Sequence, residues 1–219
     1  GLEGADLEAF QQTLALSLGK VSPATMLHAG ICESYHSGLE KASKLGGVKL
    51  LARSHEKADA AKTHAESVVV TTELSTFRKH PELAEEVFGP FAVLVSAPTI
   101  ADLEKVAMEM EGQLTATVHG TAEDLGQVQN LVKVLQRKAG RLIINGFPTG
   151  VEVCPSMNHG GPYPATTDVR FTSVGTAALY RFVRPVCYQD FPPDLLPEAL
   201  REDNPLRLLR MVDGRMEKQ

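Results

Sequence analysis

Two side chains near the middle of the chain, a carboxylate and an aromatic ring, have types that can contact a small molecule. Glu86 and Phe88 are separated by one residue. A carboxylate can accept two hydrogen bonds from a diol, and an aromatic face can position a flat ring. Such residues are also common on ordinary surfaces and in ordinary cores. The pair therefore indicates a binding site only in combination with the sequence around it.

A second possible chemistry is nucleophilic. Cys154 lies five residues before His159, and a thiol becomes reactive when a neighbouring base or cation lowers its pKa. One hypothesis is therefore a cysteine hydrolase that uses these two residues, although free cysteines are usually small buried hydrophobic residues. Cys32 and Cys187 are predicted to be structural. Neither the cysteines nor the histidines show zinc-ligand spacing, so we predict no metal site.

Alternating strands and helices are predicted to position these side chains. The first part of the chain indicates helices at Asp6–Gly19, Ile31–Leu45 and His80–Glu86, and strands at Val48–Ala52 and Glu66–Thr72. The next part indicates strands at Phe91–Ser96, Thr115–Val118 and Leu142–Ile144, separated by helices at Thr99–Glu111 and Thr121–Lys138. This order favours parallel pairing with right-handed crossovers. The predicted fold class is α/β, a mostly parallel sheet with helices on both faces.

The sequence changes character after Asn145. Residues 146–168 are rich in Gly, Pro, Thr and Asn, and long ordered loops of this kind are often functional. A short helix is predicted at Ser173–Phe182, followed by an edge strand at Arg184–Tyr188, where Pro185 excludes a central position. Asp190–Gln219 is predicted to be an extended tail over the body. We therefore divide the chain into residues 1–183 and 184–219.

The hexapeptide Glu85-Glu86-Val87-Phe88-Gly89-Pro90 resembles a motif of NAD(P)-dependent aldehyde dehydrogenases. The resemblance covers essentially the whole chain and corresponds to the C-terminal part of that family's catalytic domain. It implies NADP or NAD as cofactor and an aldehyde as substrate. By the same resemblance, Glu86 binds the hydroxyls of the nicotinamide ribose and Phe88 packs near the nicotinamide.

Two further segments carry the resemblance. Ile143-Ile144-Asn145-Gly146-Phe147 is similar to the strand that leads into the family's aldehyde pocket. The pocket residues would be Phe147, Pro148, Thr149, Val151, Val153 and His159. The unusual stretch from Asn158 to Gln189 resembles the branch that includes α-ketoglutarate semialdehyde (2,5-dioxopentanoate) dehydrogenases and bacterial NADP-dependent fatty aldehyde dehydrogenases. The branch implies a homo-oligomer assembled through the strand near Arg184 to Tyr188.

The family reaction needs residues that this sequence does not supply. A cysteine thiolate attacks the aldehyde and a separate glutamate activates water, and the cofactor sits on a Rossmann-like domain. No Gly-Gln-x-Cys segment and no Gly-rich Rossmann turn is present. We expect the nucleophile, the general base and the cofactor domain to lie upstream of residue 1. The chain by itself is then expected to be an inactive fragment.

Composition excludes some other classes of function. The net charge is −5 and no basic stripe is present, which argues against nucleic-acid binding. No apolar run approaches the length of a membrane span, and three cysteines without a pairing pattern favour a cytoplasmic setting. A non-catalytic assembly module, acting through the C-terminal strand, remains the third hypothesis beside the dehydrogenase and the hydrolase.

Overall fold

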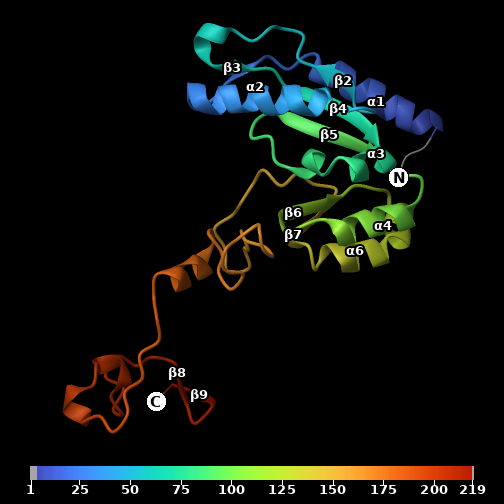
Figure 1. Ribbon diagram of the computed structural model, residues 1–219. Coiled ribbons are helices and arrows are strands. Elements are labelled where there is room, and N and C mark those ends of the chain that lie inside the picture. The colour runs from blue at the N-terminus through green and yellow to red at the C-terminus, as the bar shows by residue number, and fades with distance from the viewer. Residues whose placement is uncertain (1–3, 219) are drawn as a thin grey trace. The chain divides into compact units, whose positions relative to one another are not determined.

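A computed structural model describes residues 4–218 of the chain (Figure 1). The chain divides into two compact units between Ala177 and Ala178, whereas the sequence suggested a division after residue 183. Within the described residues, the first unit holds three sheets with their helices, one of them a two-residue pair, and the second unit holds a small hairpin. The mixed α/β class is confirmed, but the strands are divided among separate sheets. None of the helices within residues 4–218 is long and apolar enough to cross a membrane.

The first sheet has the strand order β2-β4-β5. Its central strand β4 (Val68–Glu73) pairs antiparallel with β2 (Lys49–Arg53) and parallel with β5 (Phe91–Ser96). Val68 and Val70 are almost completely buried, as expected for β-branched residues in a central strand. A short antiparallel pair, β1 (Ala24–Thr25) with β3 (His64–Ala65), lies beside the helix α2 (Ala29–Ser43).

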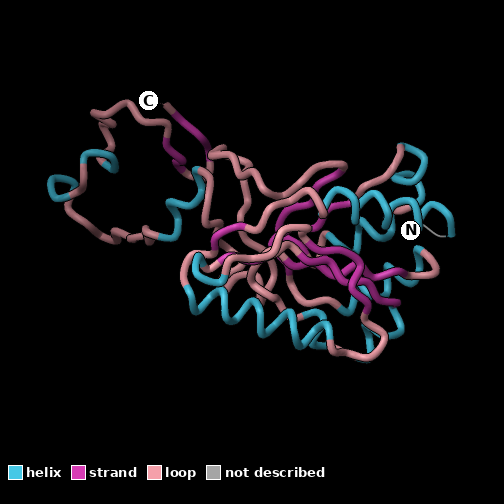
Figure 2. Tube along the Cα trace, turned by 90° about the horizontal axis from the view of Figure 1, so that it is seen from above, coloured by secondary structure: helices cyan, strands magenta, loops and turns pink. Residues whose placement is uncertain are grey.

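Three helices accompany this sheet: α1 (Gly4–Leu18), α2 (Ala29–Ser43) and α3 (Leu74–Lys79). The side chain of His28 caps α2 by accepting a hydrogen bond from the Ile31 N–H. Cys32, Tyr35 and Ala42 are the buried residues of α2, and this spacing places them on one helix face. In Figure 1, α2 runs along one side of the strands, and Figure 2 shows from above that helices (cyan) lie beside the strands (magenta).

The second sheet is the parallel pair β6 (Gln113–Val118) and β7 (Ala139–Ile144). Helix α4 (Ile100–Glu109) precedes β6, and α5 (Ala122–Gln127) and α6 (Gln129–Leu135) connect β6 to β7. Thr99 caps α4, and Thr121 with Asp124 forms a capping box on α5, which explains why these helices begin where the sequence suggested. The predicted parallel pairing of the strands β6 and β7, which these helices connect, is confirmed.

Two predicted helices differ in the structure. The segment predicted as one helix over Thr121–Lys138 breaks at Val128, whose backbone has φ −100° and ψ 21°. The predicted helix at His80–Glu86 is a single 3₁₀ turn at Pro81–Ala84, because Glu85 is already extended. The extended backbone from Glu85 onward brings the following residues against α2.

The C-terminal predictions need correction. The predicted helix at Ser173–Phe182 is a 3₁₀ turn at Thr176–Arg181. Arg184–Tyr188 forms no strand within the described residues, because no other segment of this chain pairs with it. The predicted extended tail instead has 3₁₀ turns at Pro193–Leu195 and Glu198–Leu200 and a hairpin of β8 (Arg210–Val212) with β9 (Arg215–Glu217).

The hairpin has a local cause that the sequence interpretation missed. Asp213 and Gly214 connect β8 and β9, and both have positive φ angles of 50° and 78°. Two-residue hairpins favour Asp-Gly because the turn requires positive φ at both positions. The Asp-Gly pair was therefore a visible signal for this hairpin.

One contact fixes the chain just before β5. The hydroxyl of Tyr35, which is 1% exposed, donates to the carbonyl of Glu66 at 2.6 Å and to that of Pro90 at 3.3 Å. Gly89 has φ +150°, and a Cβ there would stand 2.4 Å from Cδ2 of Tyr35. Val87 packs over Gly38 of α2, where a Cβ would come within 3.0 Å of its side chain. A tyrosine and two glycines thus hold the entry to β5 against the helix.

The fit at Gly89 predicts the effect of adding one methyl group. We expect Gly89→Ala to lower the free energy of unfolding by about 1–3 kcal/mol, because the new Cβ overlaps the Tyr35 ring in a backbone conformation that alanine disfavours. Urea unfolding measures this change. The control is Gly126→Ala in α5, where nothing lies within 4 Å of the new Cβ, and a gain of up to about 1 kcal/mol is expected. Unchanged stability of Gly89→Ala would contradict the packing described.

The buried phenol of Tyr35 predicts a dependence of stability on pH. Burial, and next the charge of Glu66, raises the pKa of Tyr35 from 10.0 to about 12. The folded state therefore holds this proton more tightly than the unfolded state, and its contribution to stability is full below pH 10 and lost as the pH rises toward 12.

Tyr35→Phe tests this contribution. We expect a loss of about 1–3 kcal/mol at neutral pH, because two carbonyls lose a donor, and a weaker decline in stability above pH 10. Urea unfolding at several pH values measures both effects. Tyr180→Phe is the control, since Tyr180 is 64% exposed. A Tyr35→Phe variant that loses stability above pH 10 as steeply as the unaltered chain would rule out the role of the phenol.

Candidate functional site

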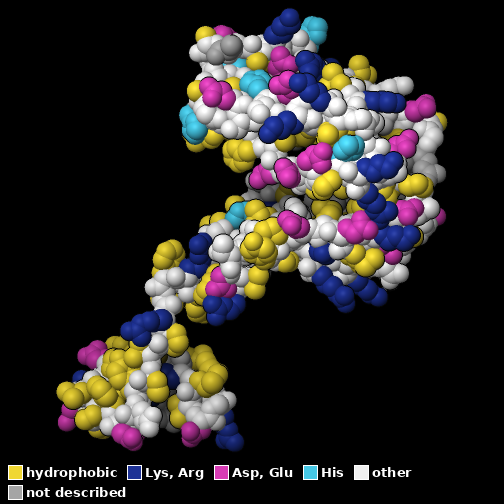
Figure 3. Space-filling view, in the orientation of Figure 1, with side chains coloured by type: hydrophobic (Ala, Val, Ile, Leu, Met, Phe, Trp, Pro, Cys, Tyr) yellow, Lys and Arg dark blue, Asp and Glu magenta, His cyan; other side chains and the backbone are white. Residues whose placement is uncertain are grey.

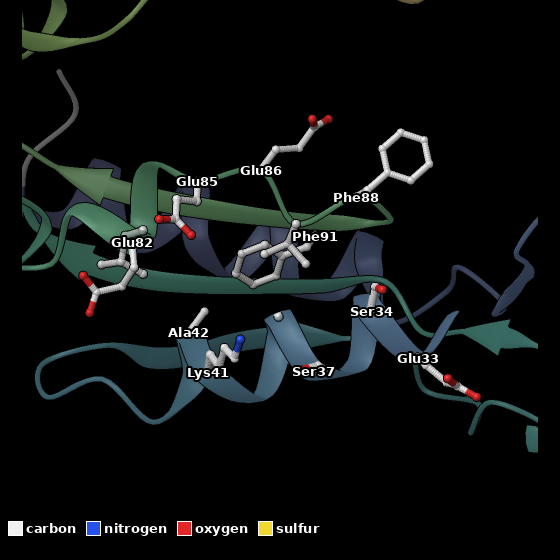
Figure 4. A pocket seen from close by; sticks show the side chains of 13 residues that line it. Glu33, Ser34, Ser37, Lys41, Ala42, Glu82, Glu85, Glu86, Phe88 and Phe91 are labelled. Carbon is white, nitrogen blue, oxygen red and sulfur yellow. The ribbon is translucent and has the colours of Figure 1, made fainter. Parts of the chain in front are cut away.

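The segment Glu85–Phe88 is extended, so its side chains alternate in direction. In Figure 4, Glu86 and Phe88 point away from α2, whereas Glu85 points toward it. Phe88 is 65% exposed, and Glu86 is also exposed. The structure therefore exposes the Glu86 carboxylate and the Phe88 ring on the same side of the segment. The opposite side of the segment packs against α2.

Two hollows lie against this segment. The first, of about 570 Å³, lies between it and α2 and is shown in Figure 4. It has Lys41 on its helical wall and several carboxylates around it, namely Glu33, Glu82, Glu85 and Glu86. The second, of about 960 Å³, is mainly apolar and follows β5 toward α4; we call it the β5 groove. Residues 85–88 line both hollows and form a wall between them.

The residues predicted to line an aldehyde pocket lie in an exposed loop after β7. Phe147 is 80% exposed, Val153 74% and Val151 43%, and Pro148 and Thr149 are also exposed. The ring of Phe147 lies 5.5 Å from that of His119. No hydrogen bond joins this loop to residues 85–90 within the described chain. The structure thus places the predicted pocket residues on the surface and shows no contact with the Glu86 segment.

Arg141 holds the start of this loop and was missed in the sequence. From β7, its guanidinium donates to the carbonyl of Gly150 at 2.8 Å and to that of Pro148 at 2.7 Å. One side chain thereby fixes two backbone positions among the predicted pocket residues. A visible signal was an arginine inside an otherwise apolar strand, Ala139–Ile144, where a charge requires partners.

Asn145 closes the end of the β6–β7 pair. Its backbone has φ +51°, and its side chain accepts from the Gly120 N–H at 2.9 Å and donates to the Gly120 carbonyl at 2.9 Å. Asparagine tolerates this left-handed backbone better than most residues do. The asparagine that ends the strand therefore determines where the exposed loop begins.

The later part of the loop packs on the other end of the same sheet. A Cβ on Gly140 would meet the Gly160 carbonyl at 1.9 Å, and Asn158 donates to the Gly140 carbonyl at 3.0 Å. The N–H of His159 donates to Thr172 Oγ1 at 2.7 Å, while Nδ1 of its ring is buried without a hydrogen-bond partner in the described structure. The backbone of His159 is therefore fixed on the sheet.

An ion pair stabilises the turn that follows. Arg170 donates to both carboxylate oxygens of Asp168, at 2.9 and 2.6 Å. These hydrogen bonds hold the pKa of Asp168 at about 2, well below its usual range. The carboxylate is consequently charged at neutral pH and serves to close the turn.

The sulfur atoms of Cys32 and Cys154 contact a carbonyl and a hydroxyl. The thiol of Cys32 is buried and donates to the His64 carbonyl at 3.6 Å. Sγ of Cys154 lies 3.5 Å from Ser156 Oγ, and no hydrogen bond links it to His159. The hydrolase hypothesis thus gains no support from the geometry. Within residues 4–218 no cluster of His, Cys, Asp and Glu is arranged to hold a metal ion.

Two curated proteins are similar to nearly the whole chain. The chain is 44% identical over 218 residues to alpha-ketoglutaric semialdehyde dehydrogenase 2 of Azospirillum brasilense. The matched region covers 99% of this chain and 41% of the Azospirillum protein. The chain is 40% identical over 216 residues to alpha-ketoglutaric semialdehyde dehydrogenase of Acinetobacter baylyi. This match covers 98% of the chain and 40% of the Acinetobacter protein. The chain therefore spans about two fifths of the length of these relatives. No family model matches it.

Solved structures show where the fold occurs. The Delta-pyrroline-5-carboxylate dehydrogenase of Mycobacterium tuberculosis bound with NAD has a TM-score of 0.66 and 15% identity, covering 88% of this chain and 37% of that one. The succinic semialdehyde dehydrogenase of Streptococcus pyogenes in complex with NADP+ has a TM-score of 0.56 and 16% identity. This match covers 71% of the present chain and 34% of the Streptococcus chain. At these identities the likeness shows the fold alone. The chain therefore shares its fold with part of these dehydrogenases and is similar in sequence to part of two alpha-ketoglutaric semialdehyde dehydrogenases.

Proposed function

We propose that this chain is one part of a longer NAD(P)-dependent aldehyde dehydrogenase whose substrate is α-ketoglutaric semialdehyde or a closely similar semialdehyde. The observation that carries the proposal is the rigidly held segment that exposes Glu86 and Phe88 together. The names of the two sequence relatives support the substrate, and the cofactors of the two solved structures support NAD or NADP.

The residues of the segment fit the cofactor that the family implies. The exposed carboxylate of Glu86 can accept hydrogen bonds from both hydroxyls of a ribose, and the exposed face of Phe88 can pack against a flat ring. Both side chains leave the same face of the backbone. A nicotinamide nucleotide, when bound, would accept a hydride from the aldehyde carbon. Glu86 and Phe88 would orient it and would take no part in bond making.

Under this proposal, the nucleophile and the general base of the reaction are residues outside this chain. A nucleophilic thiolate and a base that activates water are both required for the reaction, and the thiols of Cys32 and Cys154 contact a carbonyl and a hydroxyl rather than a base. The chain contributes one wall of the cofactor site and a loop, Phe147 to Val153 with His159, that lines the aldehyde entrance. The exposed apolar side chains of that loop support this assignment.

We also propose that the protein is a cytoplasmic homo-oligomer assembled through Arg184–Tyr188. This segment is exposed, has no strand partner in the described chain and follows the exposed Phe182 and Val183. An extended segment of this kind can pair with a strand of another copy. The cytoplasmic setting is supported by three cysteines that form no disulfide.

The role of Glu86 is tested by Glu86→Gln in the full-length enzyme. We expect the KM for NAD(P) to rise roughly 10- to 100-fold, because a charged hydrogen-bond acceptor is lost, while the KM for the aldehyde stays unchanged. Steady-state kinetics with each substrate varied separately measures this. Glu85→Gln is the matched control, since that carboxylate points toward α2, and it should leave both constants unchanged. An unchanged cofactor KM in Glu86→Gln would refute the cofactor role.

Arg141→Lys in the same enzyme tests the loop. Lysine keeps the charge but lacks the planar fork that donates from two separate nitrogens, so we expect the KM for the aldehyde to rise about tenfold or more through misplacement of the loop. The KM for NAD(P) should not change. Arg137→Lys, at an exposed position just before β7, serves as the control. A rise in the cofactor KM with no change for the aldehyde would show that the loop has another role.

A further inference from the structure

The parallel strands β6 and β7 end at the same edge of their sheet. Val118 and Ile144 are register partners and are the last residues of the two strands. Open α/β sheets bind their ligands beyond the carboxyl ends of such strands. The residue that follows β6 is His119, which the sequence-based prediction of the site did not include. This histidine therefore lies at the edge where the exposed loop after β7 begins.

The backbone on both sides of His119 is held by Asn145. The Asn145 N–H donates to the Val118 carbonyl at 3.0 Å. The Asn145 side chain accepts from the N–H of Gly120 and donates to the carbonyl of Gly120, each at 2.9 Å. Three hydrogen bonds thus fix the residues immediately before and after the histidine. An exposed side chain on a backbone held in this way can meet a ligand at a defined place.

The imidazole of His119 packs against the ring of Phe147. The two ring centroids lie 5.5 Å apart, and the ring planes are tilted by 47°. Neither ring nitrogen of His119 has a hydrogen-bond partner within residues 4–218. Both residues are exposed, and Figure 3 shows hydrophobic side chains (yellow) on the segment that follows β7. The pair therefore offers a ligand an apolar surface together with an N–H donor.

The other charged groups around this loop are not suited to hold an anion. The guanidinium of Arg141 is already engaged with two loop carbonyls. Among residues 145–158 the only charged side chain is that of Glu152, which would repel an anion. The carboxylate of Asp124, on the helix after the histidine, accepts from the N–H and the hydroxyl of Thr121. The imidazole is thus the side chain at this edge that can donate to a negatively charged group.

We propose that His119 binds the carboxylate of the semialdehyde substrate by donating an imidazole N–H to it, while Phe147 packs against the carbon chain. The inference rests on the proposed function, because it takes α-ketoglutaric semialdehyde as the substrate. That molecule has an aldehyde at one end and a carboxylate at the other, so its site requires a donor away from the reacting carbon. A hydrogen bond to a carboxylate is stronger than one between neutral groups. The histidine thereby selects an acidic aldehyde over a neutral one of the same length.

The selectivity of the full-length enzyme tests this role. His119→Phe keeps a flat ring for the contact with Phe147 and removes the donor. We expect kcat/KM for 2,5-dioxopentanoate to fall roughly 10- to 100-fold through KM, and kcat/KM for pentanal, which has as many carbons and no carboxylate, to stay within about twofold. His119→Gln retains an N–H donor and should recover part of the loss. Steady-state kinetics with both aldehydes measures these values.

His55→Phe is the matched control, since His55 is also exposed and lies just beyond β2, and it should leave kcat/KM for both aldehydes unchanged. Equal losses on both aldehydes in His119→Phe would show a structural role, and no loss on either would show that the substrate does not meet the ring. Each of these results overturns the proposal, as does a His119→Gln variant no better than His119→Phe.

The unaltered enzyme separates this inference from the proposed function. If it does not prefer 2,5-dioxopentanoate to pentanal, the assigned substrate is wrong and the role of His119 fails with it. If it does prefer the acid and His119→Phe keeps that preference, the proposed function stands and only the role of the histidine is overturned.

Discussion

The hydroxyl of Tyr35 is the contact on which the candidate site depends. It reaches two carbonyls from different segments, Glu66 just before β4 and Pro90 just before β5. These strands are parallel neighbours, so a single side chain from α2 sets the level at which both begin. The ring also occupies the space that a side chain at position 89 would need. Glycine at this position is therefore a consequence of the tyrosine, and the extended course of Glu85–Phe88 follows from both.

This anchoring explains how exposed residues can form a precise site. Glu86 and Phe88 lie on the surface and make few contacts of their own, so their position must come from the backbone that carries them. Val87 and Gly89, which alternate with them, are the residues that contact α2. The motif thus has two interleaved sets of residues. One set holds the segment to the helix, and the other is free to meet a ligand.

The sequence predicted those features that depend on local signals. Thr99 and Thr121 mark the starts of α4 and α5 because their side chains cap the helices, and alternating strands and helices predicted the parallel β6–β7 pair. What it missed depends on distant partners. The extended backbone at Glu85 requires Tyr35, fifty residues earlier, and the role of Arg141 requires loop carbonyls whose position no spacing rule gives. The Asp213-Gly214 hairpin is different, because its signal was local and was overlooked.

The β5 groove and the segment Glu85–Gly89 are physically connected. Residues 85–89 line the groove as well as approaching α2, so Tyr35 supports the segment from one side while the other side faces the open edge of β5. The backbone of residues 85–88 thus separates a hollow with charged walls from a mainly apolar one. The orientation of Glu86 and Phe88 between these two environments depends on the contacts that Val87 and Gly89 make with α2.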